Sequence, residues 1–240
     1  MLFSLLSSGD IKQAIISILL TLPVILIALS FHEASHAYAA YKMGDRTSYN
    51  LGRMTFNPIK HLDPIGFICM LVFGYGWAKP VPINARNFKN PKRGMALTAI
   101  AGPACNLVLG TLSSALYAVT VFISVAFAKE LYTMELLSNI LSVLSMLFYL
   151  GGMLNFMLAV FNMIPLPPFD GSRFFSLFLP TKWYFAIMKY ERYTMIAVLG
   201  ISMICSRIFN FSPFSWVAEK LFDGIALPIL TMLLNIFGFF

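Results

Sequence analysis

Charged residues are scarce in this chain of 240 residues. Asp, Glu, Lys and Arg together make up 11% of the sequence, whereas a soluble globular domain carries about 25%. Hydrophobic residues make up 59%, and the mean hydropathy is +0.79. This composition excludes an ordinary water-soluble domain. It predicts a polytopic membrane protein whose apolar runs cross the bilayer as helices of about 20 residues or more.

Cysteine is also rare, and its spacing excludes a disulfide framework. Cys69, Cys105 and Cys205 lie in or beside apolar segments without a CxxC pattern, so we expect them to be small core residues. The net charge of +7 does not indicate a nucleic-acid partner, because the basic residues follow membrane topology. Thirteen of the 17 Lys and Arg residues fall in residues 42–93 and 166–192. Both stretches are therefore expected on the cytoplasmic side of a plasma or inner membrane.

The apolar runs predict an all-α, multi-pass fold with about five transmembrane helices. These cover roughly residues 13–41, 95–128, 135–164, 193–210 and 221–240. We expect the first run to be retained rather than cleaved as a signal peptide, since its far end carries ionisable residues. Residues 65–77 are apolar but would form a helix of only about 20 Å, so they are expected to re-enter the membrane rather than cross it. Residues 51–56 and 80–84 look extended and predict short strands in the same loop.

One motif carries the chemistry. His32 and His36 stand four residues apart in the first apolar run, with Glu33 between them. On a helix this spacing places both imidazoles on one face, where they can bind one Zn²⁺ while the glutamate handles the proton of an attacking water. Ionisable side chains at membrane depth are costly and indicate function.

A catalytic zinc needs a third protein ligand on the same side of the membrane. Asp170 is the candidate, because it follows the third apolar run after three prolines, Pro165, Pro167 and Pro168. Prolines interrupt a helix and can turn the chain back toward the bundle. A capped loop between two spans is the alternative interpretation of the same residues.

These residues resemble the site-2 proteases, a family of zinc intramembrane metalloproteases, in their small bacterial or archaeal form. The resemblance covers roughly residues 10–175. The matching pieces are Phe31 to His36, Gly102 to Asn106, Asn162 to Gly171, Gly44-Asp45 and Gly76 to Asn84. No stretch between the apolar runs is long enough for the PDZ or CBS domain that many members carry.

The resemblance implies a three-helix catalytic core with one Zn²⁺ per chain, held by His32, His36 and Asp170, with Glu33 as general acid and base. It also implies that Asn106 and Asn162 face the site and donate hydrogen bonds to the substrate carbonyl or its oxyanion. An interhelical hydrogen bond is the alternative role for each asparagine.

The expected protein is thus a single membrane-embedded protease domain over residues 1–240, with a catalytic core at about 10–175 and accessory helices at about 176–240. It would hydrolyse peptide bonds within or near transmembrane segments of other membrane proteins, with its active site toward the cytoplasm. Substrate selection would rest on the helix bundle, on prior cleavage by another protease, or on partner proteins. Two alternatives stay open. One is a catalytically silent relative that binds membrane proteins, and the other is a metal transporter.

Overall fold

A computed structural model describes residues 11–73, 76–180, 182–183, 186, 189–209 and 211–239. The chain divides into two compact units. Unit 1 is drawn from Met1–Cys105 and Asn162–Ala197, and unit 2 from Asn106–Phe161 and Val198–Phe240. The prediction that the whole chain forms one protease domain is not tested by this division and stays a prediction.

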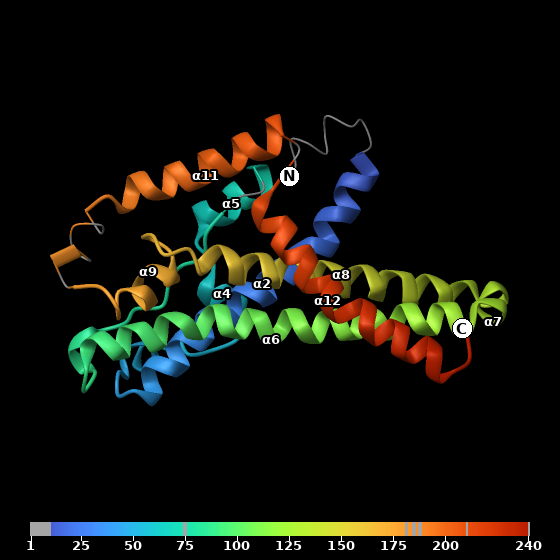
Figure 1. The fold of residues 1–240 in the computed structure, drawn as a ribbon, viewed down its shortest axis with the longest axis horizontal. Coiled ribbons are helices and arrows are strands. Elements are labelled where there is room, and N and C mark those ends of the chain that lie inside the picture. Colours follow the sequence, from blue (N-terminus) through green and yellow to red (C-terminus); the bar gives the residue numbers. More distant parts are fainter. Residues whose placement is uncertain are drawn as a thin grey trace. The chain divides into compact units, whose positions relative to one another are not determined.

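Within the described part of the chain, three helices are long and apolar enough to cross a membrane. Within α2 (Ile11–Lys42) the candidate span is Ile15–Lys42, and the other two are the whole of α6 (Pro91–Ala126) and α8 (Glu135–Asn162). Figure 1 shows α6 as one unbroken helix although Pro103 lies inside it. The first three predicted spans therefore correspond to α2, α6 and α8, and the prediction of an all-helical fold is confirmed for the described residues.

The predicted fourth and fifth spans are not confirmed. They correspond to α11 (Glu191–Ile208) and α12 (Pro213–Ile236), and their predicted last residues, 210 and 240, lie outside the described residues. The apolar part of α11 is only Tyr193–Ser206, and a helix of that length covers about 21 Å, short of the ~30 Å hydrocarbon core. α12 is long enough, but Glu219, Lys220 and Asp223 occupy its first half.

The loop between α2 and α6 is built from short helices: α3 (Thr47–Asn50), α4 (Pro58–His61), α5 (Pro64–Phe73) and the 3₁₀ turn η1 (Ala85–Asn87). Asp63 caps the start of α5, where its Oδ1 accepts hydrogen bonds from the backbone N–H groups of Ile65 and Gly66 at 3.0 and 2.8 Å. Re-entry of residues 65–77 stays a prediction, and residues 74–75 lie outside the described part of the chain.

The short strands predicted in this loop are not confirmed. Among the described residues the only β-pairing is an isolated antiparallel bridge between Leu62 and Ala78. Residues 51–56 include turns and bends, whereas residues 80–84 have no regular secondary structure. Pro80 and Pro82 have no backbone N–H and cannot complete a ladder. Side chains replace a partner strand there, as described below.

Unit 2 has its own apolar core. Ala118, Phe156, Ala218, Phe222 and Ala226 form a buried cluster. Two glycines let aromatic rings approach a helix closely: a Cβ at Gly110 would meet Phe156 at 2.7 Å, and one at Gly152 would meet Phe222 at 2.6 Å. A short helix, α7 (Ala128–Thr133), lies between α6 and α8 in the sequence. Small residues let long helices pack closely in a membrane, where the hydrophobic effect does not drive helix association.

Candidate metal centre

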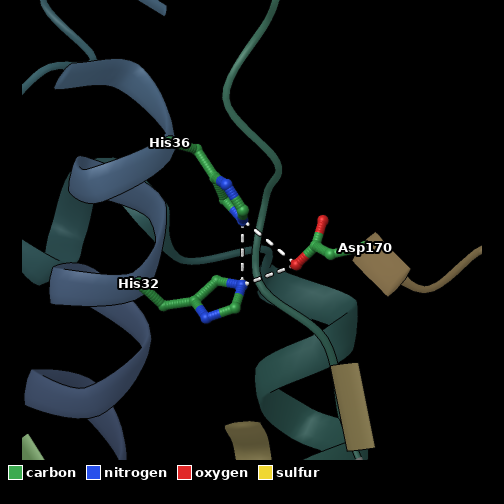
Figure 2. Close-up of side chains that lie close together, drawn as sticks. All are labelled: His32, His36 and Asp170. Carbon is green, nitrogen blue, oxygen red and sulfur yellow. Dashed lines mark hydrogen bonds and ion pairs between the residues drawn. The ribbon is translucent and has the colours of Figure 1, made fainter. Parts of the chain in front are cut away.

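Helix α2 presents two histidines on one face. His32 and His36 are one helical turn apart, and only 5% and 6% of their surfaces are exposed. Their Nε2 atoms lie 3.0 Å from each other, and Figure 2 shows both rings directed to the same point. The i, i+4 spacing of the sequence motif therefore brings two nitrogen ligands together as predicted.

Asp170 brings a carboxylate oxygen to the two histidine nitrogens from another helix. It is the first residue of α9 (Asp170–Phe175), and its Oδ2 lies 3.1 Å from Nε2 of His32 and 3.2 Å from Nε2 of His36 (Figure 2). The next residue must be small, since a Cβ at Gly171 would lie 2.4 Å from the carbonyl oxygen of Met163. That contact brings the start of α9 against the end of α8, within unit 1.

The spacing of the three ligand atoms fits zinc. They form a nearly equilateral triangle with sides of 3.0, 3.1 and 3.2 Å. Tetrahedral zinc with bonds of about 2.0 Å separates its ligand atoms by about 3.3 Å. Among the described residues, these three form the one cluster of His, Cys, Asp and Glu side chains able to hold a metal ion. One position of a tetrahedral site would remain open, as catalytic zinc requires.

The backbone fixes the tautomer of His36. Its Nδ1 lies 2.7 Å from the carbonyl oxygen of Thr98 on α6, and a carbonyl only accepts. Nδ1 therefore carries the proton, and the lone pair is left on Nε2, which faces the other ligands. A backbone carbonyl that orients a ligating imidazole in this way is a common supporting contact in metal sites.

Asp170 is suited to act as an anionic ligand. Burial opposes its ionisation, but the neighbouring His36 and His32 outweigh burial and hold the pKa of the carboxyl well below its usual range. The group is therefore a carboxylate at neutral pH and needs to lose no proton to bind a cation.

Gly102 of α6 lies directly against the histidines. A Cβ at this position would meet Nε2 of His36 at 2.5 Å, and Cε1 of His32 and of His36 at 2.6 Å. Any side chain there would displace a ligand. Gly102 belongs to one of the stretches that carry the family resemblance, but only the structure shows that this glycine makes room for the imidazoles.

Glu33 is buried, and its carboxylate is held by the loop. Its Oε2 accepts a hydrogen bond from the backbone N–H of Val81 at 2.9 Å. Glu33 and His36 are three residues apart, so they are neighbours on the surface of α2. The catalytic role of Glu33 stays a prediction at this point, but the side chain has the burial and the fixed orientation that a catalytic base requires.

The two asparagines belong to different units. Asn106 belongs to unit 2, where its Nδ2 donates to Oδ1 of Asn155 on α8 at 2.7 Å, and Nδ2 of Asn155 donates to the carbonyl oxygen of Gly151 at 2.8 Å. This is the interhelical hydrogen bond that the sequence left as an alternative. Asn162 ends α8 and belongs to unit 1. Their predicted contact with a substrate stays a prediction.

The site thus combines two imidazoles and a carboxylate, at zinc spacing, with a buried glutamate on a helix apolar enough to cross a bilayer. This combination defines the class: a membrane-bound zinc metallopeptidase. Comparison with known proteins agrees. The profile of Peptidase family M50 matches residues 20–205. The chain therefore belongs to this family, the site-2 proteases.

Three curated relatives carry the description "Putative zinc metalloprotease". YwhC of Bacillus subtilis (strain 168) is 39% identical over 175 residues, which cover 73% of this chain and 76% of YwhC. Rip2 of Mycolicibacterium smegmatis is 31% identical over 91 residues, 36% of this chain and 35% of Rip2. MJ0611 of Methanocaldococcus jannaschii is 28% identical over 144 residues, 60% of this chain and 62% of MJ0611. No solved structure matches the chain.

Proposed function

We propose that this protein is an intramembrane endopeptidase that binds one zinc ion per chain and cleaves peptide bonds within or near the transmembrane segments of other membrane proteins. The observation that carries the proposal is the triangle formed by His32 and His36 of the apolar helix α2 and by Asp170 of α9. His32 lies ten residues before Lys42, the end of α2, which corresponds to about 15 Å along the helix. A scissile bond at this site would lie below the membrane surface.

His32, His36 and Asp170 would hold the zinc ion. When bound, zinc supplies a Lewis acid that lowers the pKa of water toward ~7 and polarises a carbonyl group. His36 keeps its proton on Nδ1, which donates to the Thr98 carbonyl oxygen, so this imidazole would bind the ion as a neutral ligand through Nε2. The Asp170 carboxylate offsets part of the positive charge of the ion.

Glu33 would act as general base and then as general acid. Its carboxylate takes a proton from the attacking water and passes it to the departing amine nitrogen, which leaves as a free amine. One of its oxygens, Oε2, is occupied by the Val81 amide. The other carboxylate oxygen is therefore the one proposed to carry the proton.

The substrates proposed are proteins with a transmembrane helix, which must unwind locally because helical peptide bonds are shielded by their own hydrogen bonds. The distribution of Lys and Arg supports a multi-pass plasma or inner membrane protein with the site open toward the cytoplasm. We also propose that another protease cleaves the same substrate first. Asn106 and Asn162 are proposed to contact the substrate.

Reconstitution tests this function. The purified protein is placed in liposomes with a tagged single-span substrate, and the wild type is compared with Glu33→Gln, which keeps the shape of the side chain but not its basicity. We expect zinc-dependent cleavage that the variant loses by a factor of about 10² to 10⁴, with zinc content unchanged. Bound zinc without cleavage in the wild type would indicate a binding protein instead, and zinc flux into the vesicles would indicate a transporter.

A further inference from the structure

Residues 79–84 form neither helix nor strand and contact α2 through Val81, and we refer to them as the strap. Val81 is buried, and its backbone N–H donates to Oε2 of Glu33 at 2.9 Å. Pro80 and Pro82 flank it and have no N–H. The Val81 amide is therefore the one backbone donor in the centre of the strap, and Glu33 is its acceptor.

The strap is fastened along its length by side chains of the preceding loop. Nη2 of Arg53 donates to the carbonyl oxygens of Lys79 and Pro80 at 2.6 and 3.3 Å, and Oγ of Ser48 donates to that of Pro82 at 2.5 Å. At its start, the N–H of Lys79 donates to the carbonyl oxygen of His61 at 2.8 Å. These bonds take up carbonyl groups that a partner strand would otherwise satisfy.

Asp45 anchors the far end of the strap. It is fully buried, and its Oδ2 accepts from the N–H of Asn84 at 2.7 Å, while Oδ1 accepts from Nδ2 of Asn87 at 2.7 Å and from the N–H of Thr47 at 3.0 Å. The N–H of Asp45 in turn donates to the carbonyl oxygen of Ala40, near the end of α2. A buried carboxylate with this many donors is strongly bound in place. The strap is thereby tied to the helix that carries Glu33.

We propose that the strap is a positioning element for Glu33, in which the Val81 amide holds one carboxylate oxygen and Asp45 holds the strap. This inference rests on the proposed role of Glu33 as general base. The strap restricts rotation of the Glu33 side chain, so the second oxygen is presented to the water in one orientation. Positioning of this kind acts on the rate of the chemical step more than on substrate binding.

The first experiment removes the donor and nothing else of the main chain. Val81→Pro deletes the N–H at a position that is already flanked by prolines, and Val81→Ala is the matched variant that keeps the N–H. With the tagged single-span substrate in liposomes, kcat of Val81→Pro should be ten- to a hundredfold lower than that of Val81→Ala. KM and zinc content should be equal in the two. Equal kcat values would overturn the proposal.

The second experiment asks whether Asp45 acts through the strap. Asp45→Ala should lower kcat in the wild-type background but by less than twofold in the Val81→Pro background, because the contact it supports is already absent. If Asp45→Ala lowered kcat by the same factor in both backgrounds, the proposed link between Asp45 and Val81 would be overturned. Arg53→Ala, which also loosens the strap, provides a second route if Asp45→Ala fails to fold, and the same pattern is expected.

Hydrogen exchange tests the contact without any activity. Since Pro80 and Pro82 have no amide proton, the exchange of Val81 is separated from that of its immediate neighbours. Glu33→Ala should accelerate exchange at Val81 by at least tenfold, and Glu33→Gln, which keeps an acceptor oxygen, should accelerate it less. Unchanged exchange in Glu33→Ala would overturn the strap contact. A wild-type protein that protects Val81 but cleaves no substrate would instead count against the proposed function.

Discussion

Substitution of Gly102 gives the sharpest test of the metal centre. The expected result is a loss of zinc affinity, although alanine favours a helix more than glycine does. In Gly102→Ala the new Cβ would lie 2.5 Å from Nε2 of His36, whereas ordinary contact begins at 3.4 Å. Either His36 or α6 must move by about 0.9 Å. Zinc sites tolerate deviations of about 0.2 Å in ligand distances, so we expect zinc affinity to fall at least tenfold.

Helix propensity acts in the other direction. Alanine stabilises a helix interior by about 0.5–1 kcal/mol relative to glycine, so a loss of zinc cannot be assigned to a weaker helix. Gly224→Ala on α12 is the matched control, because a Cβ there has no neighbour within 4 Å. Zinc affinity is measured by competition with a chromogenic chelator, and helix content by circular dichroism. The reasoning is refuted if Gly102→Ala binds zinc as tightly as Gly224→Ala.

Three further outcomes are expected. Asp170→Asn removes the charge but not the shape of the third ligand, so zinc should be lost at chelator concentrations that leave the wild type loaded, as metal analysis after dialysis would show. The hydrogen bonds from Thr47, Asn84 and Asn87 lower the pKa of Asp45 despite its burial. These hydrogen bonds therefore stabilise the folded protein fully above about pH 3.9, the pKa of Asp45 in the unfolded chain. The stabilisation is lost as the pH falls through the lower pKa of Asp45 in the folded protein. Thermal melting of the wild type should weaken over that acidic range, while Asp45→Asn should be less stable at pH 7 and show a flatter dependence. Asn155→Ala should destabilise the protein by about 0.6–2 kcal/mol through the lost bond to Asn106, and denaturant titration in detergent would detect it; a variant as stable as the wild type would show that this bond contributes nothing.

The sequence was most informative where periodicity and chemistry coincide. The i, i+4 spacing of His32 and His36 on an apolar run was enough to predict both the helix and the shared face of the ligands. Asp170 was identified from its place after the prolines and from the family resemblance, and the structure places it 3.1 and 3.2 Å from the two imidazoles. The three longest apolar runs likewise became the three candidate spans.

The rest could not be predicted, because it depends on contacts between distant segments. Residues 80–84 form no strand in the structure, and a pattern of prolines cannot reveal that Arg53 and Ser48 donate to carbonyl groups that a partner strand would otherwise satisfy. The strands predicted there were not confirmed for this reason. Asp45 was noted only as part of a matching dipeptide, and its burial at the end of α2 follows from donors up to 42 residues away. The predicted span at 221–240 is not confirmed, because Glu219, Lys220 and Asp223 occupy the first half of α12.

The contact between His36 and Thr98 affects how this site can be probed. The acceptor is a main-chain carbonyl, so an alanine scan across α6 would leave it in place and would score position 98 as silent with respect to the metal. The buried Thr98 hydroxyl has no hydrogen-bond partner among the described residues, so a variant that removes this hydroxyl would not report on the contact between His36 and the carbonyl. Only a change to the backbone, such as replacement of the 98–99 peptide bond by an ester, would weaken this acceptor. Mutational maps of this centre will therefore understate how much of it is made from main chain.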